Sequence, residues 1–278
     1  MYLRSMPPFV LDSDKWPRLP QAHRDFLHSA IPKLRADARL VGLAAGGSFI
    51  SGGLDEFSDL DLVVVAAADA AREVLSGGAA LAAQLGPLLA SFTGDHVGEP
   101  RLLICLYGPP LLHVDLKFLS THELAHRVED PVILWDRDGE VRLGLSRGRP
   151  VYPQPDPQWI EDRFWVWVHY IVVKIARGEL FEALDGLAFI RRRVLGPLIL
   201  LDAGLQPDGV RRLESGAPQY VARMSAAVGA HDRASCRDAL AAAIALYVSL
   251  RRQFAVPGLI RRTEAERAAK AFLEERLR

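Results

Sequence analysis

Residues 46–61 read GGSFISGGLDEFSDLD, and this stretch with its flanking apolar runs decides the fold of the N-terminal half. Asp59 and Asp61 begin the run DLDLVVV (59–65), which predicts a buried strand. Side chains alternate along a strand, so the two aspartates leave the same face, roughly 6.5–7 Å apart along the backbone. Carboxylates in an apolar strand are costly unless cations or hydrogen bonds neutralise them. The pattern therefore predicts a cation site where this strand begins.

The residues upstream supply a partner for such a cation. Residues 40–45 predict a short apolar strand, and the Gly46-Gly47 pair lets the backbone turn tightly and approach a ligand closely. Ser48 then lies where a helix N-terminus would present N–H groups to a phosphate. One half of the motif would bind phosphate and the other half the divalent ion that accompanies it. Together they indicate metal-dependent nucleotide chemistry.

A third carboxylate is available further along the chain. Residues 101–107 and 111–118 are two β-rich runs joined by Gly108-Pro109-Pro110, which predicts a hairpin. Asp115 lies in the second run, LLHVDLKF, with apolar neighbours on both sides. Asp59 or Asp61 alone would be compatible with a cap or a solvent-facing strand residue, but all three acids together favour a functional site.

These residues resemble a known family. Gly47-Ser48 followed by Asp59-Leu60-Asp61 is similar to the signature of the DNA polymerase β-like nucleotidyltransferases, and most similar to the bacterial aminoglycoside and lincosamide nucleotidyltransferases. The third carboxylate of the family pattern would be Asp115. The resemblance covers residues 42–65 and 101–118, and extends more weakly over 159–200. It implies that Gly47 and Ser48 bind nucleotide and that the three aspartates are the metal ligands and catalytic residues.

The resemblance also implies a reaction. Mg2+ or Mn2+ and a nucleoside triphosphate, with ATP as the first candidate, would be bound together. A hydroxyl of the acceptor would attack the α-phosphorus and pyrophosphate would leave, with two metal ions stabilising the attacking and leaving oxygens. Asp115 is the candidate for orienting or deprotonating the hydroxyl, and Glu179 is the second candidate. An aminoglycoside, a lincosamide, another small hydroxyl compound and a protein side chain are all open as acceptor.

The domain organisation follows from a proline-rich segment, since four prolines in residues 149–157 interrupt regular structure. Residues 1–150 are expected to form an α+β nucleotidyltransferase domain, a mixed sheet flanked by helices that binds Mg-NTP. Residues 151–278 are expected to form an all-α helical domain that closes the acceptor cleft. In the first domain we expect a helix at 20–38, two short helices within 69–90, and strands at 132–136 and 140–143. In the second we expect helices at about 157–177, 180–203, 217–229, 234–254 and 262–278.

Lys174 is the candidate contact to the triphosphate from the helical domain. The run from Tyr170 through Lys174 to Glu179 is similar to the streptomycin adenylyltransferase-like group, in which a helical-domain lysine meets the triphosphate. A lysine in an otherwise apolar stretch needs an anionic partner or a route to solvent, so a snorkelling surface lysine is the alternative. Five acids could line an acidic cleft for a polycationic acceptor or could simply be solvated: Glu161, Asp162, Glu179, Glu182 and Asp185.

Two other patterns indicate metal sites but fail on inspection. Residues 122–126, HELAH, match the zinc-protease pattern, but Glu129 and Val132 stand where its longer form needs glycine and histidine, so a short polar helix is expected. Residues 136–139, DRDG, lack the remaining ligands of a calcium loop and predict a β-turn.

Composition limits the class of partner. The 34 basic residues balance the 34 acidic residues, which disfavours nucleic acid and anionic membranes as partners. Two cysteines, no N-terminal signal pattern and no membrane-length apolar run predict a cytoplasmic protein, and the excess of arginine over lysine indicates a GC-rich bacterial genome. A monomer and a homodimer are both compatible with this sequence. The alternative to an enzyme is a catalytically silent nucleotidyltransferase-fold protein that binds nucleotide or a protein partner.

Overall fold

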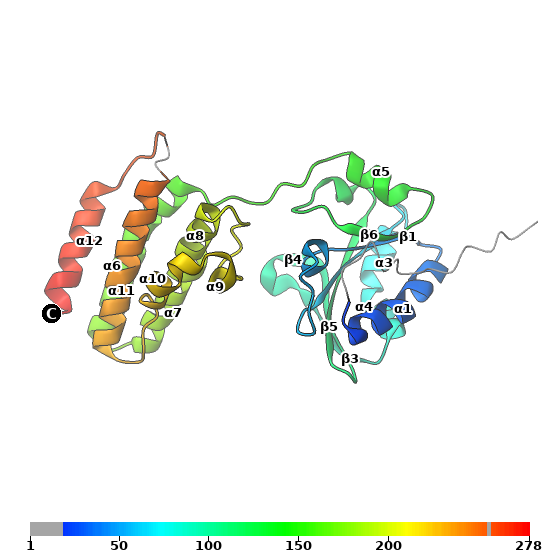
Figure 1. Cartoon of the computed structure of the whole chain (residues 1–278), viewed down its shortest axis with the longest axis horizontal. Coiled ribbons are helices and arrows are strands. Elements are labelled where there is room, and N and C mark those ends of the chain that lie inside the picture. The colour runs from blue at the N-terminus through cyan, green and yellow to red at the C-terminus, as the bar shows by residue number, and fades with distance from the viewer. Residues whose placement is uncertain (1–18, 255–256) are drawn as a thin grey trace, which may run out of the picture. The chain divides into compact units, whose positions relative to one another are not determined.

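The computed structural model describes residues 19–254 and 257–278. The N-terminal segment, for which the sequence predicts no signal peptide, lies outside the described residues. The chain divides into two compact units between Tyr152 and Pro153, within the proline-rich segment (Figure 1). Each unit has its own hydrophobic core and is described by itself.

The first unit is built on a mixed sheet of six strands in the order β3-β4-β5-β2-β1-β6. Strands β2 and β5 pair in parallel, and the other neighbouring pairs are antiparallel. The predicted hairpin is confirmed as β4 and β5. The strands are β1 (Leu40–Ala45), β2 (Leu60–Ala66), β3 (Leu88–Gly94), β4 (Glu99–Tyr107), β5 (Leu112–Ser120) and β6 (Val132–Asp136).

Helices cover both faces of this sheet. The larger core joins the strands to α1 (Gln21–Ala36), the one-turn α2 (Ser48–Ser51), α3 (Ala71–Ser76) and α4 (Gly78–Leu85). A smaller core on the other face joins Val41, Val65 and Leu119 to the 3-10 turn η2 (Glu123–Ala125) and to α5 (Glu140–Ser146). The sequence prediction of an α+β domain with a mixed sheet flanked by helices is confirmed.

Two predictions in this unit need correction. The strand expected at 140–143 is wrong, because these residues begin α5. Asp136 accepts hydrogen bonds from the N–H groups of Val141 (2.8 Å) and Arg142 (3.3 Å), and this capping favours a helix. The two short helices expected within 69–90 are present as α3 and α4, but the strand β3 that follows them was not predicted. It lies at the edge of the sheet and leaves Leu89 and Phe92 exposed, so it lacks the apolar alternation of a half-buried strand.

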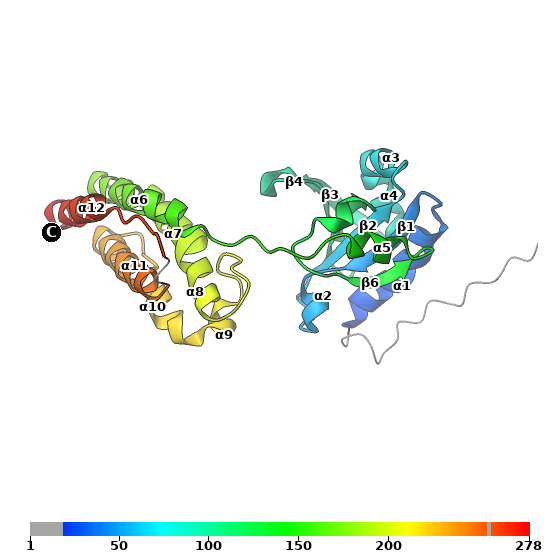
Figure 2. The same ribbon diagram turned by 90° about the horizontal axis from the view of Figure 1, so that it is seen from above.

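The second unit contains only helices, as predicted. Helices α6 (Pro157–Arg177), α7 (Leu180–Ile190), α11 (Arg233–Gln253) and α12 (Thr263–Arg276) lie side by side (Figures 1 and 2). Asp156 caps α6 by accepting from the N–H groups of Gln158 and Trp159, and Pro157 occupies the first turn, where its missing N–H costs nothing. The shorter elements are α8 (Gly196–Asp202), α9 (Leu213–Gly216), η4 (Pro218–Tyr220) and α10 (Val221–Ser225).

The single helix expected over 180–203 is interrupted. A π-helical segment, η3 (Arg191–Leu195), separates α7 from α8. Pro197 has no N–H to donate to the carbonyl four residues earlier, that of Arg193, so regular α-helical bonding cannot continue through this point. The helix expected over 217–229 is likewise divided, into η4 and α10.

Cys105 and Cys236 are both buried and free, which is typical of cysteines that act as small apolar packing residues. Within the described residues, no helix combines the length and the apolar character needed to cross a bilayer.

A buried ion-pair network holds the helical unit together. Glu161 is fully buried and accepts from the Tyr247 hydroxyl (2.6 Å), the Arg251 guanidinium (2.9 Å) and the backbone N–H of Arg262 (3.0 Å). Arg251 also pairs with Glu266 at 2.8 Å. Burial opposes ionisation of Glu161, but these hydrogen bonds outweigh it and hold the pKa below its usual value. Burial likewise opposes ionisation of Glu266, yet Lys270 and Arg251 lower its pKa to about 2.

Replacing Arg251 with methionine should therefore destabilise the helical unit by about 3–5 kcal/mol, because Glu161 is left charged and unpaired in the core. The adjacent Arg252, which is exposed, gives the control Arg252→Met. Because the carboxyl pKa values of Glu161 and Glu266 are lowered in the folded state, these groups stabilise the fold at pH values above their unfolded pKa near 4.5. This contribution is lost as the pH falls towards about 2. Urea unfolding of both variants between pH 4.5 and about 2 should show the difference in their free energies of unfolding becoming smaller as the pH falls. A difference that does not depend on pH would contradict the ionised state of these buried carboxyls.

Candidate metal and nucleotide site

Three carboxylates meet where β2 and β5 run side by side. The parallel register places Asp61 directly beside Asp115, and Asp59 lies two residues before Asp61. Each of the three offers one carboxylate oxygen, and these oxygens all lie within 4.8 Å of one another. Among the described residues this is the single group of three or more His, Cys, Asp or Glu side chains close enough to share an ion. The sequence prediction that these acids converge is consistent with this arrangement.

The charge in this cluster is only partly compensated. Burial raises the pKa of Asp115, and the nearby charge of Asp59 raises it further. His113 opposes this shift, because its Nε2 lies 2.9 Å from Oδ1 of Asp115. The side chain of Asp115 is only 18% exposed, whereas that of His113 is 49% exposed. A divalent cation would relieve the remaining repulsion, and carboxylate oxygens are the ligands that Mg2+ and Mn2+ prefer.

The Gly46-Gly47 turn touches this cluster directly. The N–H of Gly46 donates to the carbonyl of Asp61 at 2.8 Å, which fixes the turn to the first residues of β2. Gly47 has a φ of +56°, and a Cβ added there would lie 1.9 Å from Oδ2 of Asp61. Only glycine combines this backbone conformation with this close approach.

Ser48 begins α2, as predicted, but the amides of the turn are already engaged. The N–H groups of Phe49 and Ile50 donate to the carbonyls of Gly46 and Gly47, each at 3.1 Å. The N–H of Gly47 donates to Oε1 of Glu129 at 2.7 Å. The Glu129 carboxylate therefore accepts the hydrogen bond of an amide that was expected to face a phosphate. Gly47 and Ser48 as nucleotide-binding residues stay a prediction.

The sequence did not identify Glu129 as a residue of this site. It lies in the loop before β6, and β6 pairs antiparallel with β1, so that Ala45 is opposite Val132. The loop before β6 therefore meets the turn after β1. The strand at 132–136 was predicted, but its pairing with β1 was not. Only that pairing indicates that Glu129 lies beside the Gly47 turn.

His23 was also missed. It is 1% exposed, and its Nε2 donates to the carbonyl of Ser58 at 2.6 Å, which anchors the residue just before Asp59 to helix α1. Its Nδ1 is buried and has no hydrogen-bond partner among the described residues. His23 lies three residues before Phe26 and four before Leu27, on the predicted apolar face of α1. A histidine on that otherwise apolar face was the sequence feature that could have indicated its buried role.

Lys174 and Glu179, the two candidates from the helical unit, pair with each other. The Nζ of Lys174 lies 2.5 Å from Oε2 of Glu179 and 5.1 Å from the centre of the Tyr170 ring. The Glu179 hydrogen bond raises the pKa of Lys174, and the same contact lowers the pKa of Glu179. A triphosphate would have to replace Glu179 as the partner of Lys174. Their roles, and the role of the helical unit in acceptor binding, stay predictions.

Most of the acids considered for an acidic cleft also have internal partners. Glu161 belongs to the buried network, Asp162 pairs with Arg262 at 2.8 Å, and Glu182 accepts from the Tyr170 hydroxyl at 2.6 Å. With Glu179 paired to Lys174, four of the five acids are engaged within the helical unit. Glu161, Asp162 and Glu179 each pair with a cationic side chain, whereas, among the described residues, the exposed Glu182 accepts only from a hydroxyl.

The two rejected metal patterns are accounted for. Residues 123–125 form the 3-10 turn η2, and Nδ1 of His122 lies 3.2 Å from an Arg147 guanidinium nitrogen. Neither His122 nor His126 belongs to a metal-competent group among the described residues. Asp136 caps α5, as already described, and residues 137–140 form a turn in which the N–H of Glu140 donates to the carbonyl of Arg137 at 3.1 Å.

Comparison with known proteins gives limited similarity. No family model matches this chain, and no curated protein sequence matches it. The structure of an aminoglycoside 6-adenyltransferase from Bacillus subtilis is 12% identical over 90% of this chain and 96% of its own, with a TM-score of 0.39. A nucleotidyltransferase-like protein from Exiguobacterium sibiricum 255-15 is 12% identical over 82% of this chain and 75% of its own, with a TM-score of 0.35. The interpretation of the site depends on its own geometry.

The close approach of Gly47 to Asp61 generates a prediction. Gly47→Ala should weaken Mn2+ binding by roughly 10–100-fold, the range expected when a group that orients a metal ligand is lost. The control is Gly98→Ala, because Gly98 has a similar φ of +78° but open space around its Cβ position. Both variants bear backbone strain of about 1–2 kcal/mol. Titration calorimetry with Mn2+ should separate them, and equal affinities would show that Gly47 does not position Asp61.

The raised pKa of Asp115 generates a second prediction. A raised carboxyl pKa stabilises the fold below the unfolded value near 3.8, and this contribution is lost as the pH rises through the folded value. At neutral pH, Asp115→Asn should therefore unfold at a higher temperature than the wild type when no metal is present. Added Mn2+ should stabilise the wild type and leave Asp115→Asn unchanged. The exposed Asp69 gives the control Asp69→Asn, and a metal-free Asp115→Asn less stable than the wild type would contradict the uncompensated charge.

Proposed function

We propose that this protein is a metal-dependent nucleotidyltransferase that moves a nucleoside monophosphate from a nucleoside triphosphate to a hydroxyl of a small molecule. The single observation that carries the proposal is the convergence of Asp59, Asp61 and Asp115 beside a glycine turn. Three carboxylates within 4.8 Å fit one or two hard divalent cations, Mg2+ or Mn2+. When bound, the cation would neutralise charge on the triphosphate and on the leaving pyrophosphate.

The residues of the chain would then bind and orient the two substrates. A phosphate oxygen close to the metal would lie near the Gly47 turn, so Glu129 would have to leave the Gly47 N–H before a phosphate could accept from it. In the transfer, a bond forms between the acceptor oxygen and the α-phosphorus, and the bond from that phosphorus to the β-phosphate oxygen breaks. Positioning and charge neutralisation supply most of the catalysis in such a step.

Asp115 is the proposed group that orients the acceptor hydroxyl or takes its proton. In the metal-free protein burial raises its pKa, and His113 lies at hydrogen-bond distance from it. Glu179 stays the second candidate, although its pairing with Lys174 gives it a lowered pKa and makes it the weaker base.

The acceptor is proposed only as a small hydroxyl-bearing molecule, for which aminoglycosides and lincosamides are the named candidates. A polycationic aminoglycoside would need an acidic surface, and the pairing of Glu161, Asp162 and Glu179 with cationic side chains gives that candidate little support.

A catalytically silent nucleotide-binding protein is the second candidate function. The observation that favours it is the Glu129 carboxylate on the Gly47 amide, where a phosphate is expected. Such a protein would bind Mg-NTP without releasing pyrophosphate.

The proposed function predicts that Mn2+ or Mg2+ together with ATP raises the melting temperature more than either alone, since the metal joins carboxylates to phosphate. A ligand at 100 times its dissociation constant would add about 2.7 kcal/mol to the free energy of unfolding. Asp59→Asn and Asp61→Asn should abolish both this shift and pyrophosphate release with candidate acceptors, while the fold survives. A shift without pyrophosphate release would favour the silent alternative. Unchanged melting with all four nucleoside triphosphates and both metals would contradict nucleotide binding.

A further inference from the structure

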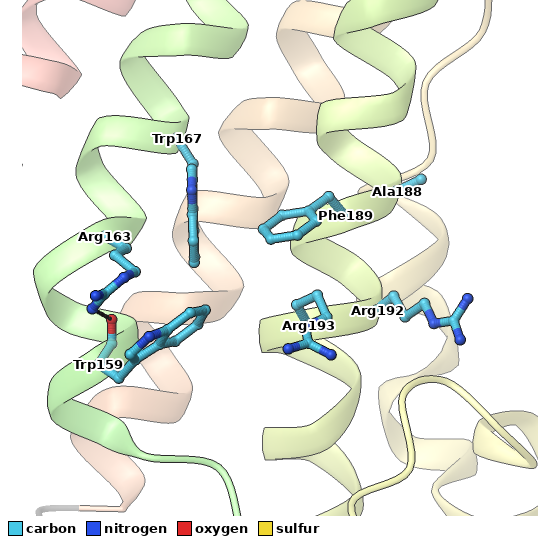
Figure 3. A pocket seen from close by; sticks show the side chains of 7 residues that line it. All are labelled: Trp159, Arg163, Trp167, Ala188, Phe189, Arg192 and Arg193. Atoms are coloured by element: carbon cyan, nitrogen blue, oxygen red, sulfur yellow. Dashed lines mark hydrogen bonds between the residues drawn. The ribbon is translucent and has the colours of Figure 1, made fainter. Parts of the chain in front are cut away.

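A second site lies entirely within the helical unit. An open pocket of about 710 Å³ lies between α6 on one side and α7 with η3 on the other (Figure 3). Its lining combines three aromatic residues with three arginines and one alanine: Trp159, Arg163, Trp167, Ala188, Phe189, Arg192 and Arg193. The proposed transfer uses none of these residues.

The aromatic residues form a connected apolar wall. The rings of Trp159 and Trp167 are 5.4 Å apart, and the rings of Trp167 and Phe189 meet edge to face at 5.0 Å. Phe189 projects from α7 towards Trp167, and the Trp159 ring extends into the space between the helices (Figure 3). Phe189 packs against the Trp167 ring and is nevertheless 41% exposed, so part of this wall faces water. A planar apolar group could stack against this wall and remove it from water.

The charge on the pocket is positive. The Arg163 guanidinium lies 4.6 Å from the centre of the Trp159 ring and donates to the Trp159 carbonyl at 3.1 Å. Arg193 emerges on the side of the pocket that faces the tryptophans, whereas Arg192 points away from them (Figure 3). No acidic residue lines the pocket.

The three consecutive arginines of η3 have different roles. Arg191 donates to the carbonyl of Ala227 at 2.8 Å and so ties η3 to the segment after α10. Arg192 and Arg193 are exposed, and within the described part of the chain neither side chain forms an ion pair or a hydrogen bond. Structural use therefore accounts for Arg191 but not for Arg193.

The helix is irregular at this position. The π-helical segment η3 presents Arg192 and Arg193, and π-helical turns inside α-helices occur frequently at functional sites. The irregularity changes the angle at which successive side chains leave the helix axis, so it determines which arginine faces the tryptophans.

From these observations we propose that this pocket binds a small planar aromatic molecule that carries an anionic group. The ring would stack against the wall formed by Trp159, Trp167 and Phe189, and the carboxylate or phosphate would accept hydrogen bonds from the Arg193 guanidinium. Aromatic walls also attract cations, but Arg163 already covers a Trp159 face and Arg193 would repel a cationic ligand. The proposal does not depend on nucleotidyl transfer.

The test uses 2-naphthoate as the probe, with 2-naphthyl phosphate as a second anion and 2-naphthylmethylamine as the cation of matched shape. Titration of the full chain, followed by tryptophan fluorescence and calorimetry, should show both anions binding more tightly than the amine. Arg193→Gln should weaken 2-naphthoate binding about tenfold, or about 1.4 kcal/mol, since it removes a hydrogen bond between two charged groups. Phe189→Leu should weaken all three probes severalfold through loss of ring contact.

Two control variants give the proposal its specificity. Arg252→Gln removes an exposed arginine of α11 outside the pocket and should leave 2-naphthoate affinity unchanged. Asp59→Asn should also leave it unchanged, which separates this pocket from the carboxylate site. An amine that binds as tightly as the anions, or equal losses in Arg193→Gln and Arg252→Gln, would overturn the proposal.

Discussion

The convergence of three carboxylates on the neighbouring strands β2 and β5 is the constraint on which the candidate site of the first unit depends. The parallel pairing of β2 with β5 places Asp61 beside Asp115, and the chain before β2 adds Asp59 within 4.8 Å. Hydrophobic packing of β2 and β5 on both faces of the sheet offsets the free-energy cost of holding the three carboxylates together. Burial is the main cause that raises the pKa of Asp115, the charge of Asp59 adds to it, and His113 opposes the shift. A bound cation would stabilise three carboxylates held this close together, which supports the proposed metal site.

The residues around the cluster hold it in place without belonging to it. Gly47 permits the turn to touch Asp61, and His23 fixes the carbonyl that precedes Asp59. Glu129 engages the Gly47 amide, so a bound phosphate and this carboxylate would compete for the same donor. In the helical unit, Lys174 is likewise engaged by Glu179. In the proposed function a phosphate would have to displace Glu129 from the Gly47 amide, so nucleotide affinity would depend on how readily this carboxylate leaves.

Local patterns predicted the parts of this protein that depend on local chemistry. The strand before Gly46, the strand after Asp59 and the helix 157–177 follow from apolar periodicity and from Pro157 and Asp156 at the helix start. Residues 140–143 were misassigned because the cap from Asp136 was not recognised, and β3 was missed because an exposed edge strand lacks alternation. Glu129 and His23 depend on pairings between distant segments, which no local pattern contains. The pocket between Trp159 and Arg193 depends on a π-helical turn that helical periodicity does not indicate.

The central claim is that Asp59, Asp61 and Asp115 together hold a divalent cation. The most direct test is anomalous diffraction from crystals grown with Mn2+ and a non-hydrolysable ATP analogue. The account predicts an anomalous peak within about 2.0–2.6 Å of oxygens from all three carboxylates, the range for hard cations with oxygen ligands, with phosphate oxygens completing the coordination. Strong Mn2+ peaks elsewhere in the crystal, with none among these three side chains, would contradict it.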